Sequence, residues 1–360
     1  MGVAMKKISI IFLLLAGVLL LTGCQKEKLF GKGSFIQFTA VSSNVGTKTA
    51  YSGSETTASG KTYERIDWKA GDRIRIWSDV AVHSTISDQH WSDYRVAAEG
   101  SPDETYDYYS NAFLTNDANS GLVWGAAGNY TFHAIYPAQA ISADGTSVTT
   151  ACSIPASQSL TLSSGVGKPD MSYAFMDATA SASTTNAGEG VPVTLQFYPA
   201  FTAFEITLRS KAETLYLGSF SIQSDGGNPI AGDFTIDYNN ATDKYQPSSV
   251  SGATQSQITI SLNDTELTST ADFKFTVLAL PETLNDLSIT FQVKDDVNAT
   301  TYTSRTLKLK RNNAYIPFPA CAKHRIYGLA LNVNDWIVAA GEDIEWDSEG
   351  LLEDIIWDTL

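Results

Sequence analysis

The sequence predicts an all-β protein made of two tandem antiparallel β-sandwich domains with a C-terminal acidic extension. Tyr, Phe, Thr, Val and Ile recur in short runs, and these residue types are enriched in strands. Gly, Asn, Asp, Ser and Pro separate the runs, as turn residues do. Before the far C-terminus, no window of a dozen residues has a convincing 3.6-residue period, so we expect few helices.

The first 24 residues have the pattern of an exported, lipid-anchored protein. Two lysines and an apolar run over residues 8–21 precede a short motif of small residues that ends at Cys24. The run is shorter than the roughly 20 residues that a membrane-spanning helix needs. A cleaved signal peptide over residues 1–23 is therefore favoured over a transmembrane anchor. Cys24 is then the predicted lipidation site, followed by a tether over residues 24–33.

Charge and cysteine content narrow the partners and the compartment. The chain has a formal net charge of −15, and loss of the signal lysines makes the exported part more acidic still. Such a surface repels nucleic acid, so we expect no nucleic-acid partner. The remaining cysteines are Cys152 and Cys321. An envelope compartment permits a disulfide between them, and the alternative is that each is an isolated buried thiol.

The first half of the chain begins with a clear strand. Ser34 to Val41 places Ile36, Phe38 and Ala40 on one face, because side chains alternate along a strand. Further predicted strands are Arg73 to Trp77, after a Lys-Ala-Gly-Asp turn, and Tyr130 to Tyr136, which Pro137 ends. Long polar loops, notably residues 79–120, are expected between these strands.

A segment of low complexity, Ala178 to Gly190, marks the expected domain boundary. We therefore expect an N-terminal sandwich over residues 34–185 and a C-terminal sandwich over residues 190–336. In the second half, apolar residues alternate with polar ones in short runs, as in strands with one buried face. These runs are Val193 to Phe197, Phe204 to Leu208, Ile258 to Leu262, Phe273 to Val277, Leu287 to Val293 and Tyr327 to Val333.

The tail, residues 337–360, is acidic and rich in tryptophan. Read at every second position, it contains an apolar row that Glu342 interrupts, and acids such as Asp343 and Asp347 lie on the opposite face. The row consists of Trp336, Val338, Ala340, Ile344 and Trp346. This alternation predicts a strand without an obvious partner. The last ten residues are also compatible with a short amphipathic helix.

Catalytic motifs are absent from the sequence. It contains no G-x-S-x-G elbow, no H-E-x-x-H and no C-x-x-C. Its four histidines are scattered, so solvated or hydrogen-bonded imidazoles are favoured over a metal site. We therefore expect no enzyme, no cofactor and no metal site.

One aromatic group is a candidate glycan contact. Tyr106, Tyr108 and Tyr109 lie close together in the sequence, and Trp91 precedes them. Aromatic rings on a loop can stack on sugars. The alternative is that the tyrosines belong to an ordinary edge strand or loop.

Several segments together resemble the fimbrillin family of Bacteroides-type bacteria, the structural subunits of type V pili and their relatives. The segments that carry the resemblance are the lipobox at Cys24, Thr47 to Tyr51, Ile66 to Ile76, Phe132 to Ala138, Val193 to Leu208, Ile230 to Phe234 and Val333 to Trp336. The most specific is the W-x-x-G-D-x-I-x-I segment that begins at Trp68.

The resemblance implies a lipoprotein precursor with two transthyretin-like domains, located at the outer membrane and in the fimbria. In polymerising members a protease removes the first strand, and the C-terminal segment of another subunit replaces it. On this chain the lost strand would be Ser34 to Val41, with Lys48 and then Arg65 as candidate processing sites. The row from Trp336 to Trp346 would be the donor strand.

The implied partners are other pilus subunits, the outer membrane through the lipid anchor, and host or bacterial surface ligands in adhesion. An alternative of a different class is a surface glycan-binding lipoprotein that uses Trp91 and the three tyrosines.

Overall fold

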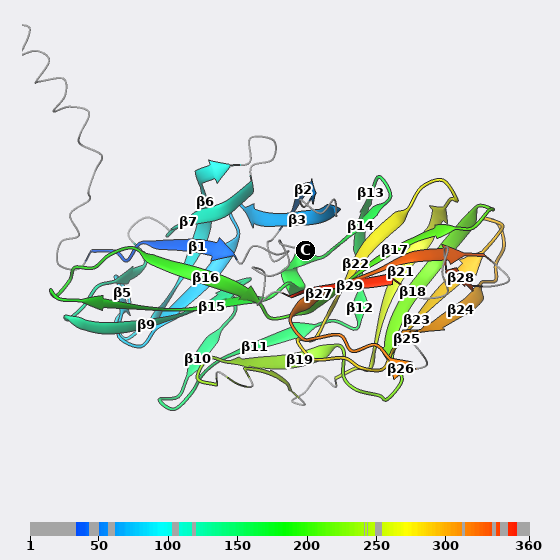
Figure 1. Cartoon of the computed structure of the whole chain (residues 1–360). Coiled ribbons are helices and arrows are strands. Elements are labelled where there is room, and N and C mark those ends of the chain that lie inside the picture. Colours follow the sequence, from blue (N-terminus) through cyan, green and yellow to red (C-terminus); the bar gives the residue numbers. More distant parts are fainter. Residues whose placement is uncertain are drawn as a thin grey trace, which may run out of the picture.

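The computed structural model describes residues 34–42, 50–56, 62–102, 108–116, 120–240, 242, 244–248, 254–311, 314–332, 336–338 and 345–350. Within these ranges every element is a strand except one short 3-10 helix, η1 (Met171–Tyr173). The all-β prediction is therefore confirmed. Figure 1 shows the strands gathered into two bodies that lie end to end, with a smaller sheet below the first body.

The largest sheet has nine strands and forms the first body. In spatial order these strands are β1 (Phe38–Ser42), β16 (Val193–Pro199), β15 (Met176–Thr184), β9 (Gly128–Tyr136), β4 (Arg73–Ser78), β6 (Trp91–Pro102), β7 (Tyr108–Thr115), β3 (Thr62–Lys69) and β2 (Ala50–Thr56). The sheet closes on itself because β1 pairs with β16 on one side and with β7 on the other. The first body is therefore barrel-like, whereas a sandwich would keep two open sheets.

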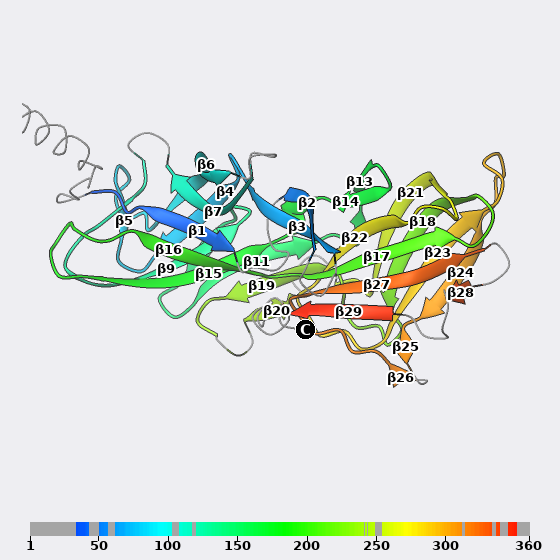
Figure 2. The ribbon, with the colours of Figure 1, turned by 45° about the horizontal axis from the view of Figure 1, so that its top comes forward.

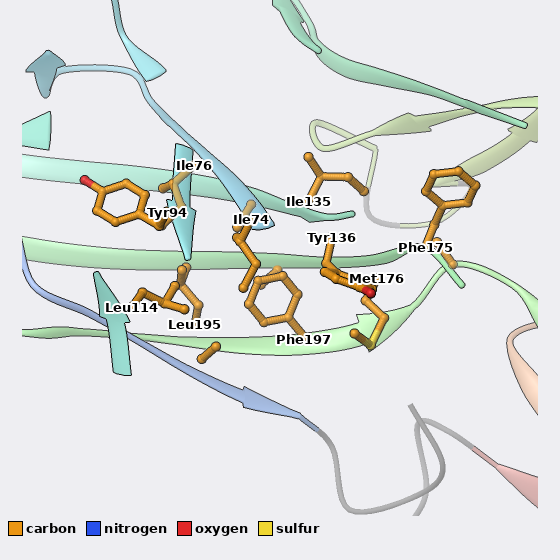
Figure 3. Packing of buried hydrophobic residues seen from close by; sticks show 14 of the residues in the cluster. Ile74, Ile76, Tyr94, Leu114, Ile135, Tyr136, Phe175, Met176, Leu195 and Phe197 are labelled. Carbon is orange, nitrogen blue, oxygen red and sulfur yellow. The ribbon is translucent and has the colours of Figure 1, made fainter. Parts of the chain in front are cut away.

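Local sequence explains the hairpin that leads into β4. Gly71 has a φ of +91°, a backbone conformation that glycine adopts without strain. The Asp72 carboxylate accepts a hydrogen bond from the Lys69 backbone N–H at 2.8 Å, and Ile74 and Ile76 then point into the core. Figure 3 shows both isoleucines among the buried side chains that fill the barrel.

A smaller sheet packs against the outside of the barrel. It consists of β10 (Ile141–Ala143), β11 (Val148–Ile154), β19 (Gly232–Asp237) and β20 (Tyr245–Pro247). Phe234 on β19 meets Phe175 edge to face at 5.8 Å between ring centroids. This sheet shares the hydrophobic core of the first body.

The second body is a sandwich of two sheets. One sheet contains β12 (Ser157–Gln158), β21 (Gln257–Leu267), β18 (Leu215–Ser224), β23 (Leu287–Lys294) and β24 (Thr303–Lys308). The other contains β13 (Leu160–Ser163), β14 (Val166–Pro169), β22 (Phe273–Ala279), β17 (Thr202–Ser210), β27 (Ala322–Leu331), β28 (Trp336–Val338) and β29 (Glu345–Gly350). Phe220 on β18 meets Phe275 on β22 at 5.0 Å across the shared core.

Two short pairs complete the described strands. They are β5 (Val82–His83) with β8 (Leu122–Val123), and β25 (Lys310–Arg311) with β26 (Ala314–Tyr315).

Strand pairing divides the chain differently from the expected boundary near residue 185. β16 belongs to the first sheet, although it lies after that boundary. Conversely, β12 pairs with β21, and β14 pairs with β22, in the second body. Pairing between distant strands decides these assignments, and local composition does not encode it.

The expected polar loop over residues 79–120 is wrong as a description of this region. About half of its length forms β6 and β7, which pair with each other and help to close the barrel. The alternating pattern is hidden here because the ladder between β6 and β7 contains two register shifts, and a bulge changes which face each side chain takes.

Candidate functional site

The strand β1 occupies the seam of the barrel. It runs parallel to β16, with Phe38 opposite Val193, and antiparallel to β7, with Phe38 opposite Leu114. Figures 1 and 2 both show β1, in dark blue, between these two strands. Both backbone edges of β1 are therefore paired, and its removal would leave an open slot between β7 and β16.

The apolar face of β1 fills the barrel interior, as the alternation predicted. Ile36, Phe38 and Ala40 expose 2%, 1% and 0% of their surface. The Phe38 ring meets Tyr94 at 5.1 Å and Phe132 at 5.2 Å, both edge to face. The burial of each large apolar side chain contributes about 1.5–3 kcal/mol. The slot therefore fits a strand that places an aliphatic, an aromatic and a small side chain, in that order, at every second position.

Main-chain hydrogen bonds hold the segment that precedes Phe38. The Ile36 N–H donates to the Leu122 carbonyl at 2.9 Å, and the Val193 N–H donates to the Gln37 carbonyl at 2.8 Å. The Trp124 N–H donates to the Ser34 carbonyl at 3.1 Å. A strand that replaces β1 would find the same donors and acceptors on its neighbours.

Of the predicted lipidation and processing residues, the structure describes Arg65. Cys24 and Lys48 lie outside the described residues. Arg65 lies within β3, opposite Gly53 of β2. A protease needs an accessible, unpaired backbone, so the pairing of Arg65 with Gly53 argues against a cut at Arg65 in this structure.

The C-terminal apolar row does have a partner, which corrects the expectation of an unpaired strand. β28 and β29 both pair antiparallel with β27 of the same chain, and Figure 2 shows β29, in red, alongside β27. The row is divided between these two strands, and Ala340 and Ile344 lie outside the described residues. The pairing was not foreseeable because β27 gives no local sign of which strand covers its second edge.

The register of these strands agrees with the predicted apolar face. Trp336 lies opposite Leu331, Val338 opposite Leu329, and Trp346 opposite Ile326. All three residues of β27 belong to the hydrophobic core of the second body. The register therefore matches apolar positions of the tail with apolar positions of β27.

A buried ionic group lies on β17, β22 and β27, and sequence analysis did not single it out. The Glu205 carboxylate is 2.9 Å from Lys323 Nζ, 3.4 Å from Arg325 Nε and 3.9 Å from Lys274 Nζ. Burial alone would raise the pKa of Glu205, but the charges of Lys323, Arg325 and Lys274 lower it below its ordinary value. Glu205 is therefore held ionised between cations.

A second buried polar network joins the barrel to the small sheet. Asp177 on β15 is fully buried and forms an ion pair with Lys244. The Tyr245 hydroxyl donates a hydrogen bond to the same carboxylate at 2.7 Å. Nearby, the His133 ring stacks on Trp77 at 5.7 Å and lies 4.7 Å from the Tyr238 ring. These contacts fix the sheet against the barrel.

The two remaining cysteines are free and buried. Cys152 lies on β11 and Cys321 immediately precedes β27. Burial, reinforced by the negative charge of Asp177, raises the pKa of both thiols well above the ordinary value. The structure thus has two isolated core thiols rather than a disulfide.

The described candidate glycan residues, Trp91, Tyr108 and Tyr109, do not come together. Trp91 begins β6 opposite Trp77, whereas Tyr109 on β7 pairs with Pro102 at the other end of β6. With 12 residues in β6 and a rise of roughly 3.3 Å per residue, these positions are far apart. Tyr108 pairs with Lys69 of β3, and Tyr106 lies outside the described residues. Tyr108 and Tyr109 therefore lie near the opposite end of β6 from Trp91.

Trp91 instead belongs to a different aromatic group, on the outer face of the barrel. Its cross-strand partner is Trp77, and the Arg75 guanidinium lies 3.9 Å from the centroid of the Trp91 ring. The Arg75 Nε donates to Asp93 at 2.7 Å. The sequence signal for this group was the alternation Arg-Ile-Arg-Ile-Trp, which places Arg75 and Trp77 on the face opposite the core isoleucines.

Two kinds of feature are absent from the described residues. In that part of the chain, no group of three or more His, Cys, Asp or Glu side chains is placed to hold a metal ion. Nor is any of its helices long and apolar enough to cross a membrane.

Comparison with known families assigns the chain. The model of the fimbrillin-like family matches residues 56–336, which is most of the chain. The protein belongs to the fimbrillin-like family. This match confirms the resemblance drawn from the sequence, and it covers both bodies of the structure. No curated protein matches the chain.

Solved structures from Bacteroides and Parabacteroides match the chain over most of its length. A candidate cell adhesion protein from Bacteroides ovatus is 11% identical, with 89% of this chain and 97% of that chain covered and a TM-score of 0.49. A second one, from Bacteroides uniformis, is 15% identical, with coverages of 88% and 96% and a TM-score of 0.48. A fimbrial assembly protein from Parabacteroides distasonis is 10% identical, with coverages of 88% and 96% and a TM-score of 0.40.

Proposed function

We propose that this fimbrillin-like protein is a structural or accessory subunit of a cell-surface pilus that serves adhesion. In this proposal it is exported as an outer-membrane lipoprotein through Cys24. A cut after Lys48 then frees β1 and separates the subunit from its lipid. The C-terminal strand of a second copy fills the vacated slot, so the partners are other pilus subunits. Family membership supports the fimbrial class, and no catalytic role is assigned.

The observation that carries the proposal is a match between β1 and the tail. Residues 36–40 read Ile-Gln-Phe-Thr-Ala, and residues 344–348 read Ile-Glu-Trp-Asp-Ser. Both alternate an aliphatic, an aromatic and a small residue with polar residues. In β1 the first set fills the barrel interior. The tail segment therefore has the residue pattern that the slot requires, with Trp346 in the place of Phe38.

The energetics favour a long-lived joint. A strand in the slot gains backbone hydrogen bonds on both edges, each worth about 1 kcal/mol net. It also buries the side chains of its apolar row, at about 1.5–3 kcal/mol for each large residue. Strand addition of this kind must still offset the cost of ordering the donor.

A peptide-binding experiment tests the proposal. Purified precursor is cut after Lys48 with trypsin, the released segment is removed, and a fluorescent peptide of residues 342–350 is added. The cut protein is expected to bind it and the intact precursor is not, because β1 fills the slot. A control peptide with Ser in place of Ile344 and Trp346 should not bind. Equal binding to cut and intact protein would contradict the slot as the acceptor.

The glycan-binding alternative retains one observation of its own. Trp77 and Trp91 are adjacent on the outer face of the barrel, and both are partly exposed. Paired indole rings beside Arg75 and Asp93 could stack on a sugar and bond its hydroxyls. A glycan array with the wild type and with Trp77→Ala tests this alternative, and no binding by the wild type removes it.

A further inference from the structure

The edge of β27 carries two buried cations beside an acidic strand. In the antiparallel register of β27 with β29, Lys323 lies opposite Glu349 and Arg325 lies opposite Asp347. Glu345, the next acid of the alternation, lies opposite Tyr327. Basic positions of one strand thus coincide with acidic positions of the other.

Both cations of β27 are buried and form ion pairs with Glu205. Lys323 and Arg325 expose 3% and 8% of their surface, and Glu205 exposes 3%. Lys274 also approaches Glu205, so one carboxylate stands among three cations. A buried charge is costly unless an opposite charge lies close to it. The register places the acidic positions of β29 opposite both cations of β27.

The register is specified by two independent patterns. Trp346 lies opposite the core residue Ile326, while Asp347 and Glu349 lie opposite the two cations. A slip of one residue would turn every side chain of the tail strand to the other face. It would bring Trp346 to the basic side and an acid to the core side. Both patterns would fail together, so the pairing discriminates against registers displaced by one residue and against neutral strands.

We propose that Lys323 and Arg325 select the acidic strand Glu345–Gly350 as the occupant of the β27 edge. The occupant in the free subunit is the chain's own tail, which is thereby kept away from the slots of other copies until one of them opens. The pairing itself needs only the structure of one chain. The inference that this pairing retains the donor strand until a slot opens rests on the proposed function.

Hydrogen–deuterium exchange of the uncut, monomeric precursor tests the pairing. In the variant Asp347→Lys/Glu349→Lys, the backbone amides of residues 345–350 should exchange at least about tenfold faster than in the wild type. The matched control is Glu353→Lys/Asp354→Lys, which makes the same change in net charge farther along the tail. This control should leave exchange at residues 345–350 unchanged. Wild-type exchange in the first variant, or equal acceleration in both, would overturn the proposal.

Charge reversal of both partners provides a second test. Arg325→Glu should accelerate exchange at residues 345–350, and addition of Asp347→Arg should restore protection. If the double variant keeps the core amides protected but leaves the tail fast, charge does not select the strand. If Arg325→Glu alone does not fold, the tail variants decide the question, because they leave the body unchanged.

The outcome of these exchange experiments does not depend on whether the proposed function is correct. Exchange is measured without cleavage or assembly, so the pairing can hold even if cut subunits never bind the tail peptide. If the function holds as well, Asp347→Lys/Glu349→Lys precursor should donate its tail to cut subunits faster than the wild type does.

Discussion

In the proposed strand exchange, Phe38 is present in the precursor and absent from the assembled subunit. Its ring fills the barrel between Tyr94 and Phe132, so Phe38→Ala deletes a fully buried aromatic group. A substitution of this kind costs about 3–5 kcal/mol, and the closed seam leaves little room for the core to collapse into the cavity. We expect the free energy of unfolding of the uncut precursor to fall by about that amount, measured by urea denaturation with tryptophan fluorescence.

The strand-exchange proposal predicts that Phe38→Ala does not change peptide binding once the protein has been cut after Lys48. Once β1 has been removed by the cut after Lys48, residue 38 is no longer part of the subunit. Phe38→Ala and wild-type proteins, both cut, should then bind the peptide of residues 342–350 with equal affinity. The control Gln37→Ala changes an exposed side chain and should alter the stability of the precursor by no more than about 0.5 kcal/mol.

Two outcomes would refute this reasoning. If Phe38→Ala leaves the stability of the precursor unchanged, β1 is not a structural part of the barrel core. If the substitution weakens peptide binding after the cut, residue 38 remains in the processed subunit, and β1 is not the strand that the donor replaces.

Three further predictions concern the buried polar groups. Asp177→Asn removes the charge that pairs with Lys244 and should lower the free energy of unfolding by about 3 kcal/mol, whereas Asp272→Asn at the surface should have little effect in the same urea titration. Burial, and then the charge of Lys244, lower the pKa of His133 to about 4 from 6.5. The unfolded chain therefore binds this proton first, so stability should fall between pH 6.5 and 4, and His133→Gln should flatten that part of the curve. Because burial raises the thiol pKa of Cys152 and Cys321, both should react with a thiol reagent only after denaturation; rapid labelling of the native protein would contradict their burial.

The sequence predicted the features that depend on local alternation. Ile36, Phe38 and Ala40 were expected to share a buried face, and they fill the barrel interior. The runs Phe204 to Leu208 and Leu287 to Val293 were expected to be strands, and both are. In each case the alternation of apolar and polar residues indicates which side chains of a strand face the core. It does so whichever strands lie beside that strand.

Features that depend on strands far apart in the sequence could not be predicted from local alternation. Nothing local in β1 indicates that β7 covers one of its edges and β16 the other. The segment Ala322 to Arg325 is polar in sequence, and nothing in it indicates that Glu205 of β17 approaches its cations and forms ion pairs with them. The tail offered an alternating pattern without a partner, because the partner strand is chosen by tertiary pairing with β27.

The central claim is that the tail of a second copy takes the place of β1, and a disulfide cross-link tests it most directly. Thr39 of β1 lies opposite Thr194 of β16, and the match of residues 36–40 with 344–348 puts Asp347 in the position of Thr39. In a background without Cys152 and Cys321, protein with Thr194→Cys is cut after Lys48 and mixed with uncut protein carrying Asp347→Cys. Neighbouring strand positions are within disulfide reach, so we predict a covalent dimer that forms only with the cut acceptor, and not with a donor carrying Asp358→Cys. No dimer, or the same yield with uncut acceptor, would contradict the account.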